Sequence, residues 1–171
     1  MIRIPKKLMY VVAFIYFSLL IYLMFFAFDR AQLLTKGQLH YDFSVNSIPL
    51  YMPNSLNWYD IKAWALDAGN LLLFIPIGII IPSLRKTNFI SFILFFLVII
   101  TVAETVQMFT NLGVFDIKDI LVNLIGATIG YWCYKLSTHN DYYDIVKIIC
   151  MSFTLAILIT SIATYINNNI L

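Results

Sequence analysis

The sequence predicts an all-α fold, an integral membrane bundle of about five transmembrane helices. Hydrophobic residues make up 61% of the 171 residues and charged residues only 12%, which is about half the charged share of a typical soluble domain. The apolar residues gather in long runs, and about 20 apolar residues in helical form cross the hydrocarbon core of a bilayer. We therefore expect one transmembrane domain over residues 1–171, without a separate soluble domain.

Five apolar runs are the expected spans. They cover approximately residues 8–28, 68–83, 88–109, 117–136 and 145–165. The first follows basic residues, as the apolar part of a signal peptide does, but it exceeds the usual ~7–15 residues and shows no good cleavage site. We therefore expect an uncleaved anchor. The second is short unless residues 58–67 extend it.

The basic residues predict the orientation, because cytoplasmic ends of membrane helices carry an excess of Lys and Arg. With the N-terminus inside, seven basic residues lie at cytoplasmic ends: Arg3, Lys6, Lys7, Arg85, Lys86, Lys135 and Lys147. Four lie outside: Arg30, Lys36, Lys62 and Lys118. We predict a multi-pass protein of the cell membrane with a cytoplasmic N-terminus and an extracellular C-terminus.

The one long connection, residues 29–67, then lies outside the membrane and is rich in aromatic residues. Within it, Trp58, Ile61 and Ala65 share one helical side, with charged residues elsewhere. This pattern predicts a short interfacial helix. Equally, the aromatic rings could act as ordinary anchors at the headgroup level that only fix helix tilt.

Polar residues interrupt the apolar spans at one depth. Glu104 lies sixteen residues after Asn88, about 24 Å along a helix, and Gln107 shares its face. In the next span, polar residues recur on one stripe near its outer end, and Asn70 lies at the outer start of the second span, one turn after Asp67. We expect one outward-facing polar pocket formed by Asn70, Glu104, Gln107, Asp116, Asp119 and Asn123.

Each of these residues also has a structural explanation. Asp116 and Asp119 stand at a helix N-terminus, where carboxylates bind free N–H groups and oppose the helix dipole. Gln107 and Asn123 could join two helices, which is worth about 0.6 kcal/mol in a membrane. Glu104 is expensive if it faces lipid, so we expect it to face the bundle interior.

Gly126 and Gly130 continue the stripe of Asp119 and Asn123. Small residues at this spacing allow a second helix backbone to approach closely. We expect them to be helix-packing residues, and they offer a contact for a homo-oligomer or a membrane partner.

Several classes of site are not expected. Cys133 and Cys150 lie in apolar segments and are predicted to be free thiols. No Cys/His cluster suits zinc, and we predict neither a metal nor a cofactor. Basic residues are scattered, so nucleic-acid binding is not expected.

The polar motifs resemble those of the VanZ-like family. The likeness runs from Asn46-Ser-Ile-Pro49 through Gly69-Asn70 and Glu104-Thr-Val-Gln107 to the stretch between Phe115 and Gly130, and so covers about residues 46–131. The resemblance implies a bacterial membrane protein that lowers susceptibility to teicoplanin-like lipoglycopeptides. The chain departs from the family pattern at Gly113-Val114, where an arginine is common, and at Lys118, where an acid is usual.

Three kinds of function follow. The leading hypothesis is an envelope protein of VanZ-like type, either non-catalytic or with a catalytic activity left open, that acts at the outer leaflet and reduces lipoglycopeptide action. Its candidate partners are a lipoglycopeptide and a lipid-linked wall precursor. The second is an intramembrane enzyme for a lipid-linked substrate, with Glu104 as acid or base and Asp116 and Asp119 holding a divalent cation; the chain offers no nucleophile–base pair for it. The third is a transport or scaffold subunit assembled through Gly126 and Gly130.

Overall fold

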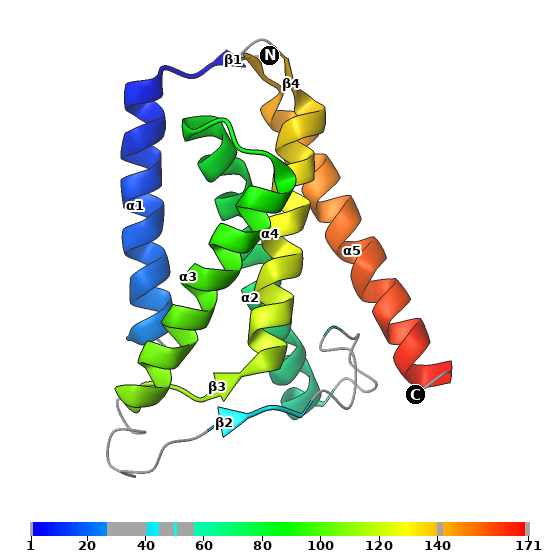
Figure 1. Cartoon of the computed structure of the whole chain (residues 1–171). Helices are drawn as coiled ribbons and strands as arrows, with labels where there is room; N and C mark the ends of the chain where they lie inside the picture. The colour runs from blue at the N-terminus through cyan, green and yellow to red at the C-terminus, as the bar shows by residue number, and fades with distance from the viewer. Residues whose placement is uncertain (1, 27–40, 45–49, 51–56, 140–141, 170–171) are drawn as a thin grey trace.

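The computed structural model describes residues 2–26, 41–44, 50, 57–139 and 142–169. Five long helices follow one another and alternate in direction, so that the two termini lie at opposite ends of the bundle (Figure 1). They are α1 (Lys6–Phe25), α2 (Trp58–Leu84), α3 (Phe89–Phe109), α4 (Ile117–Ser137) and α5 (Ile145–Asn169). The predicted all-α membrane bundle is confirmed. Most of the expected outer loop 29–67, and the 46–49 motif, lie outside the described residues.

Four of these helices are long and apolar enough to cross a membrane: α1, residues 67–84 of α2, α3 and α5. The helix α4 is not among them, and its run is more polar, with Lys118, Asp119, Asn123 and Lys135. It contacts α2, α3 and α5, so much of its surface faces protein rather than lipid. This central position explains how a less apolar helix fits inside the bundle.

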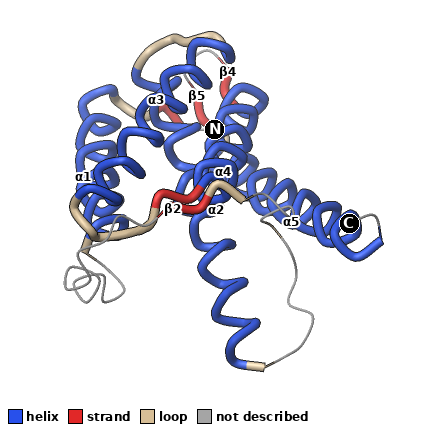
Figure 2. Tube along the Cα trace, turned by 60° about the horizontal axis from the view of Figure 1, so that its bottom comes forward, coloured by secondary structure: helices blue, strands red, loops and turns tan. Residues whose placement is uncertain are grey.

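In α2, residues 58–67 form the first turns and extend the second span, which is one of the two expectations for this segment; they do not form a separate interfacial helix. Asn57 caps it, accepting a hydrogen bond from the backbone N–H of Asp60 at 2.8 Å. Once a helix is nucleated, each added residue extends it at little cost. Figure 2 shows these N-terminal turns projecting away from the other helices.

The helices α2 and α4 touch backbone to backbone, and glycines make this contact. A Cβ on Gly126 would collide with the carbonyl oxygen of Leu71, and one on Gly130 with that of Ile75. A Cβ on Gly78 would likewise meet the carbonyl oxygen of Ala127. The predicted small-residue face is therefore covered by α2 of the same chain, and a partner helix at these glycines would have to displace α2.

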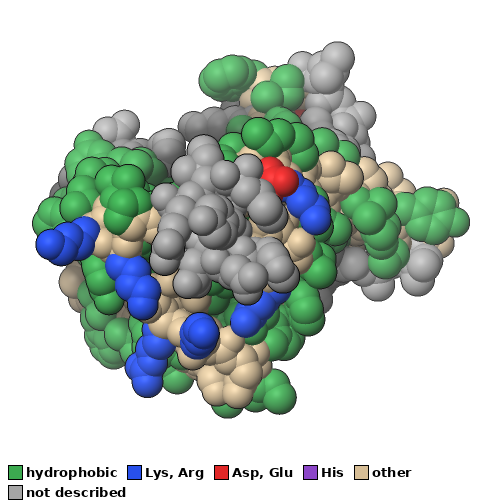
Figure 3. Space-filling model, turned by 90° about the horizontal axis from the view of Figure 1, so that it is seen from above, with side chains coloured by type: hydrophobic (Ala, Val, Ile, Leu, Met, Phe, Trp, Pro, Cys, Tyr) green, Lys and Arg blue, Asp and Glu red, His purple; other side chains and the backbone are tan. Residues whose placement is uncertain are grey.

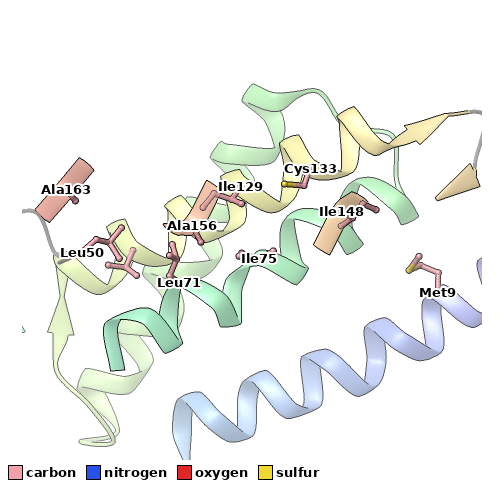
Figure 4. Packing of buried hydrophobic residues seen from close by; sticks show 10 residues of the cluster. Met9, Leu50, Leu71, Ile75, Ile129, Cys133, Ile148, Ala156 and Ala163 are labelled. Carbon is pink, nitrogen blue, oxygen red and sulfur yellow. The ribbon is translucent and has the colours of Figure 1, made fainter. Parts of the chain in front are cut away.

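Apolar packing fills the bundle on both sides of this contact. Between α2, α4 and α5, one cluster gathers Leu71, Ile75, Ile129 and Cys133, as Figure 4 shows. It also includes Leu50, which is only 2% exposed and reaches the core from the connection before α2. A second cluster joins Phe92, Phe96 and Tyr131 with Phe74 between α2, α3 and α4. Cys133 and Cys150 are free.

Short strands close each end of the bundle. At one end β1 (Ile2–Arg3) and β4 (Thr138–His139) both pair antiparallel with β5 (Tyr142–Tyr143). At the other end β2 (Tyr41–Asp42) runs parallel to β3 (Phe115–Asp116), just before α4. Hydrogen bonds from Ser44 to the Asp42 carboxylate hold the pKa of Asp42 below its ordinary value. The β2–β3 pair thus fixes part of the α1–α2 connection beside the start of α4.

Candidate functional site

A cavity of about 380 Å³ lies between α1, α2, α3 and α4, near the end where α3 stops and α4 starts. Its polar lining comes from three carboxylates and three amides. These are Asp67, Asn70, Glu104, Gln107, Asp119 and Asn123. Five of the six residues expected in a polar pocket therefore line one cavity, and Asp116 does not.

The turn between α3 and α4 places these side chains at one depth. After Phe109 the chain reverses at Asn111, whose φ of 55° is left-handed, and the N–H of Leu112 donates to the carbonyl of Gln107 at 3.0 Å. Glu104 and Gln107 lie in the last turns of α3, while Asp119 and Asn123 lie in the first turns of α4. A short connection between antiparallel helices brings such positions together.

The polar side chains face the interior of the bundle. Glu104 and Gln107 are each 3% exposed and Asn123 is 2% exposed. The Gln107 amide Nε2 donates to the backbone carbonyl of Met24 in α1 at 2.7 Å. The Asn70 amide Nδ2 donates to Asp119 Oδ1 at 3.2 Å. These two bonds tie α3 to α1 and α2 to α4 around the cavity.

The cavity has unused capacity to accept hydrogen bonds. Asn123 Oδ1 is buried and has no hydrogen-bond partner among the described residues, a situation that costs about 1–3 kcal/mol for a neutral group. The amide groups of Asn70 and Gln107 already donate a hydrogen bond within the protein. None of the described lining residues is Lys, Arg or His. A group that donates hydrogen bonds or carries positive charge would complement this lining.

Asp116 has a local role instead. It is the N-cap of α4, and its carboxylate accepts a hydrogen bond from the backbone N–H of Lys118 at 2.8 Å. The capping explanation therefore accounts for this carboxylate, which is not among the side chains that line the cavity. No group of three or more His, Cys, Asp or Glu side chains that could hold a metal ion is found in the described parts of the chain.

The cavity also includes residues that the sequence argument did not assign to it. Asp67 lines it. Its position in the sequence, one helical turn before Asn70, could have identified it as a cavity residue. Leu23 and Met24 close it from the end of α1. The residues around them in the sequence are uniformly apolar, so only the folded position of α1, which contacts α2 and is hydrogen-bonded to α3 through Gln107, identifies them.

This geometry defines a class: a multi-helix membrane protein with an acidic cavity enclosed by four of its helices. The chain belongs to the VanZ/LLP1 family, whose profile matches residues 13–138. That range contains every described residue that lines the cavity and ends before α5. The family assignment predicted from the polar motifs is confirmed.

One curated relative gives a more specific likeness. Over 72 residues the chain is 29% identical to Protein VanZ of Enterococcus faecium. The match covers 42% of this chain and 45% of that protein, so it spans less than half of the relative. No solved structure matches the chain significantly.

Proposed function

We propose that this protein acts at the outer leaflet of the cytoplasmic membrane and lowers susceptibility to teicoplanin-like lipoglycopeptides through its acidic cavity. Membership of the VanZ/LLP1 family and the likeness to Protein VanZ support this assignment. The observation that carries it is the cavity itself, where buried Glu104 and the unpaired oxygen of Asn123 line one space.

The charge distribution supports an outward-facing cavity. Figure 3 shows Lys and Arg side chains gathered at the end of the bundle where α1 and α5 begin. Those at the helix ends there are Lys6, Lys7, Arg85, Lys86, Lys135 and Lys147. Because cytoplasmic ends carry such an excess, this distribution supports an orientation with the basic end inside the cell and the cavity at the opposite end toward the exterior.

The lining indicates which chemistry the cavity would recognise. Carboxyl groups and the unpaired amide oxygen of Asn123 accept hydrogen bonds, and charge-assisted bonds are about twice as strong as neutral ones. A protonated amine or a cluster of hydroxyl or amide donors would fit, on an amphiphile that reaches the cavity from the outer leaflet. Glycopeptides and lipid-linked wall precursors both meet the membrane on this side.

Growth inhibition in a susceptible Gram-positive host tests the proposal. The wild-type chain should raise the teicoplanin concentration needed for inhibition and leave the vancomycin value within twofold. Glu104→Gln and Asp119→Asn should return the teicoplanin value to that of the empty host, because each replaces a carboxyl group of the cavity with an amide of similar size. Asp144→Asn is the matched control, since it removes an acid that caps α5 at the other end.

Membrane levels must be equal for all variants, measured by an epitope tag. Wild-type expression without any change in teicoplanin inhibition would contradict the proposed function. Equal loss of the teicoplanin effect in all three variants would show that the carboxyl groups of the cavity are not its cause.

A further inference from the structure

A second cavity, of about 620 Å³, lies at the other end of the bundle between α1, α2 and α3. It falls within the size range of ligand pockets, about 300–1,000 Å³. Its wall is apolar and is formed by side chains such as Phe17 of α1, Ile77 and Ile81 of α2, and Phe95 and Ile99 of α3. An apolar chain, rather than a polar solute, suits this wall.

The mouth of this cavity has the opposite character. Arg85 and Lys86, both exposed, stand where α2 ends. Thr87 Oγ1 is buried there without a hydrogen-bond partner in the described chain. The first turn of α3 follows, with a neutral cap in which Asn88 accepts from the Ser91 N–H at 2.8 Å, and with no acidic residue.

These features favour an anion at the mouth. A helix N-terminus carries partial positive charge and readily binds phosphate. Two basic side chains add to that field, and none of the described lining residues is Asp or Glu. The mouth and the wall together therefore match a molecule with a phosphate at one end and a hydrocarbon chain at the other.

We propose that this cavity binds an anionic glycerophospholipid, with its phosphate at Arg85 and Lys86 and one acyl chain along the wall. Ser91 at the mouth and Ile99 deeper in the wall are eight residues apart, about 12 Å along α3. The acyl chain would thus run parallel to the helices, as it does in the bilayer. The basic end of the bundle also places the mouth at the headgroup level of its leaflet.

Lipid titration of the purified full chain in a neutral detergent, followed by native mass spectrometry, tests this proposal. The probes are dioleoyl phosphatidylglycerol, dioleoyl phosphatidylcholine and glycerol phosphate. The wild type should bind phosphatidylglycerol at least tenfold more tightly than phosphatidylcholine, and glycerol phosphate should not compete at equal concentration.

The double variant Arg85→Gln/Lys86→Gln should bind phosphatidylglycerol about 30-fold more weakly, given about 1 kcal/mol for each basic residue near an anionic lipid. The matched control Lys135→Gln/Lys147→Gln removes the same charge from the same end but not from the cavity lining, and should stay within threefold of the wild type. Ser91→Trp should also weaken binding at least tenfold, because it blocks the mouth without changing charge.

Three results would overturn the proposal. Equal affinity for the two lipids would show that the groove binds lipid only through its apolar wall. Equally weakened phosphatidylglycerol binding in both double variants would show a general effect of charge rather than a site at Arg85 and Lys86. Displacement of the lipid by glycerol phosphate would show a phosphate site that does not use the wall. None of these readouts depends on antibiotic susceptibility, so the outcome is independent of the proposed function of the acidic cavity.

Discussion

The two ends of this bundle carry cavities of opposite chemistry. One is lined by Asp67, Glu104 and Asp119 with no described Lys or Arg. The other has an apolar wall and a mouth with Arg85 and Lys86 and no described acid. On the two proposals above, Arg85 and Lys86 would serve two purposes: they would help to set the orientation of the protein, and they would favour an anionic ligand at their end of the bundle.

A layer of phenylalanine side chains, here called the aromatic wall, lies between the two cavities. Phe74 lines the acidic cavity and Phe96 lines the basic one. Their rings meet edge to face with centroids 5.8 Å apart, and Phe92 packs behind Phe96 at 6.3 Å. Both cavities therefore share structural elements even though their chemistry differs.

The largest expected effect is the accessibility of the two ends from outside the cell. In a background with Cys133→Ala and Cys150→Ala, a single cysteine is introduced at one end of the bundle. Tyr41→Cys places it at the end that holds the acidic cavity, where Tyr41 pairs with Phe115, and Lys86→Cys places it at the basic cavity; both positions are exposed. A membrane-impermeant maleimide should label the Tyr41→Cys protein in intact cells. It should label the Lys86→Cys protein only after permeabilisation.

The labelling difference should be all or none, because a charged reagent does not cross the bilayer. The parent without cysteines gives the background signal. The reverse pattern would place the acidic cavity in the cytoplasm, and the comparison of an outer acidic site with an inner basic site would then be inverted.

The next largest effect concerns the aromatic wall. Phe96→Ala should destabilise the protein by about 3–5 kcal/mol, the usual cost of removing a buried phenylalanine, since Phe96 is only 2% exposed. Denaturant unfolding in detergent measures this change. Phe95→Ala is the control, because Phe95 is 51% exposed and its loss should cost less than 1 kcal/mol. Similar losses for the two variants would show that Phe96 does not support a shared wall.

The sequence was sufficient to predict the helices and five of the polar side chains that gather around the acidic cavity. Long apolar runs locate membrane helices because the bilayer sets their length, and buried acids stand out against such runs. The fold of α2 was less predictable, since continuing the helix through residues 58–67 depends on the Asn57 cap and on the absence of a strong breaker.

The roles of Asp116 and Met24 could not be predicted from the sequence. A carboxylate at a helix start can cap the helix or line a pocket, and only the bond to the Lys118 N–H distinguishes the two roles. Met24 contributes a backbone carbonyl to Gln107, and a carbonyl is present at every residue of the chain. The basic cavity was not predicted at all, because its wall is made of residues that look like ordinary lipid-facing side chains.

The smallest of the three effects tests how the two ends are held together. Gly130→Ala should destabilise the protein by about 1–3 kcal/mol, because the new Cβ would meet the Ile75 carbonyl and the helix backbones must move apart. Gly69→Ala is the matched control in α2: no atom lies within 4 Å of its added Cβ, so it should be neutral or stabilising by up to about 1 kcal/mol. Unfolding midpoints in detergent measure both variants.

Since α2 contributes to both cavities, the displaced helix should weaken lipid binding at one end and the teicoplanin effect at the other. If only one of these two effects is weakened, the two cavities do not depend on each other's structure despite the helix they share.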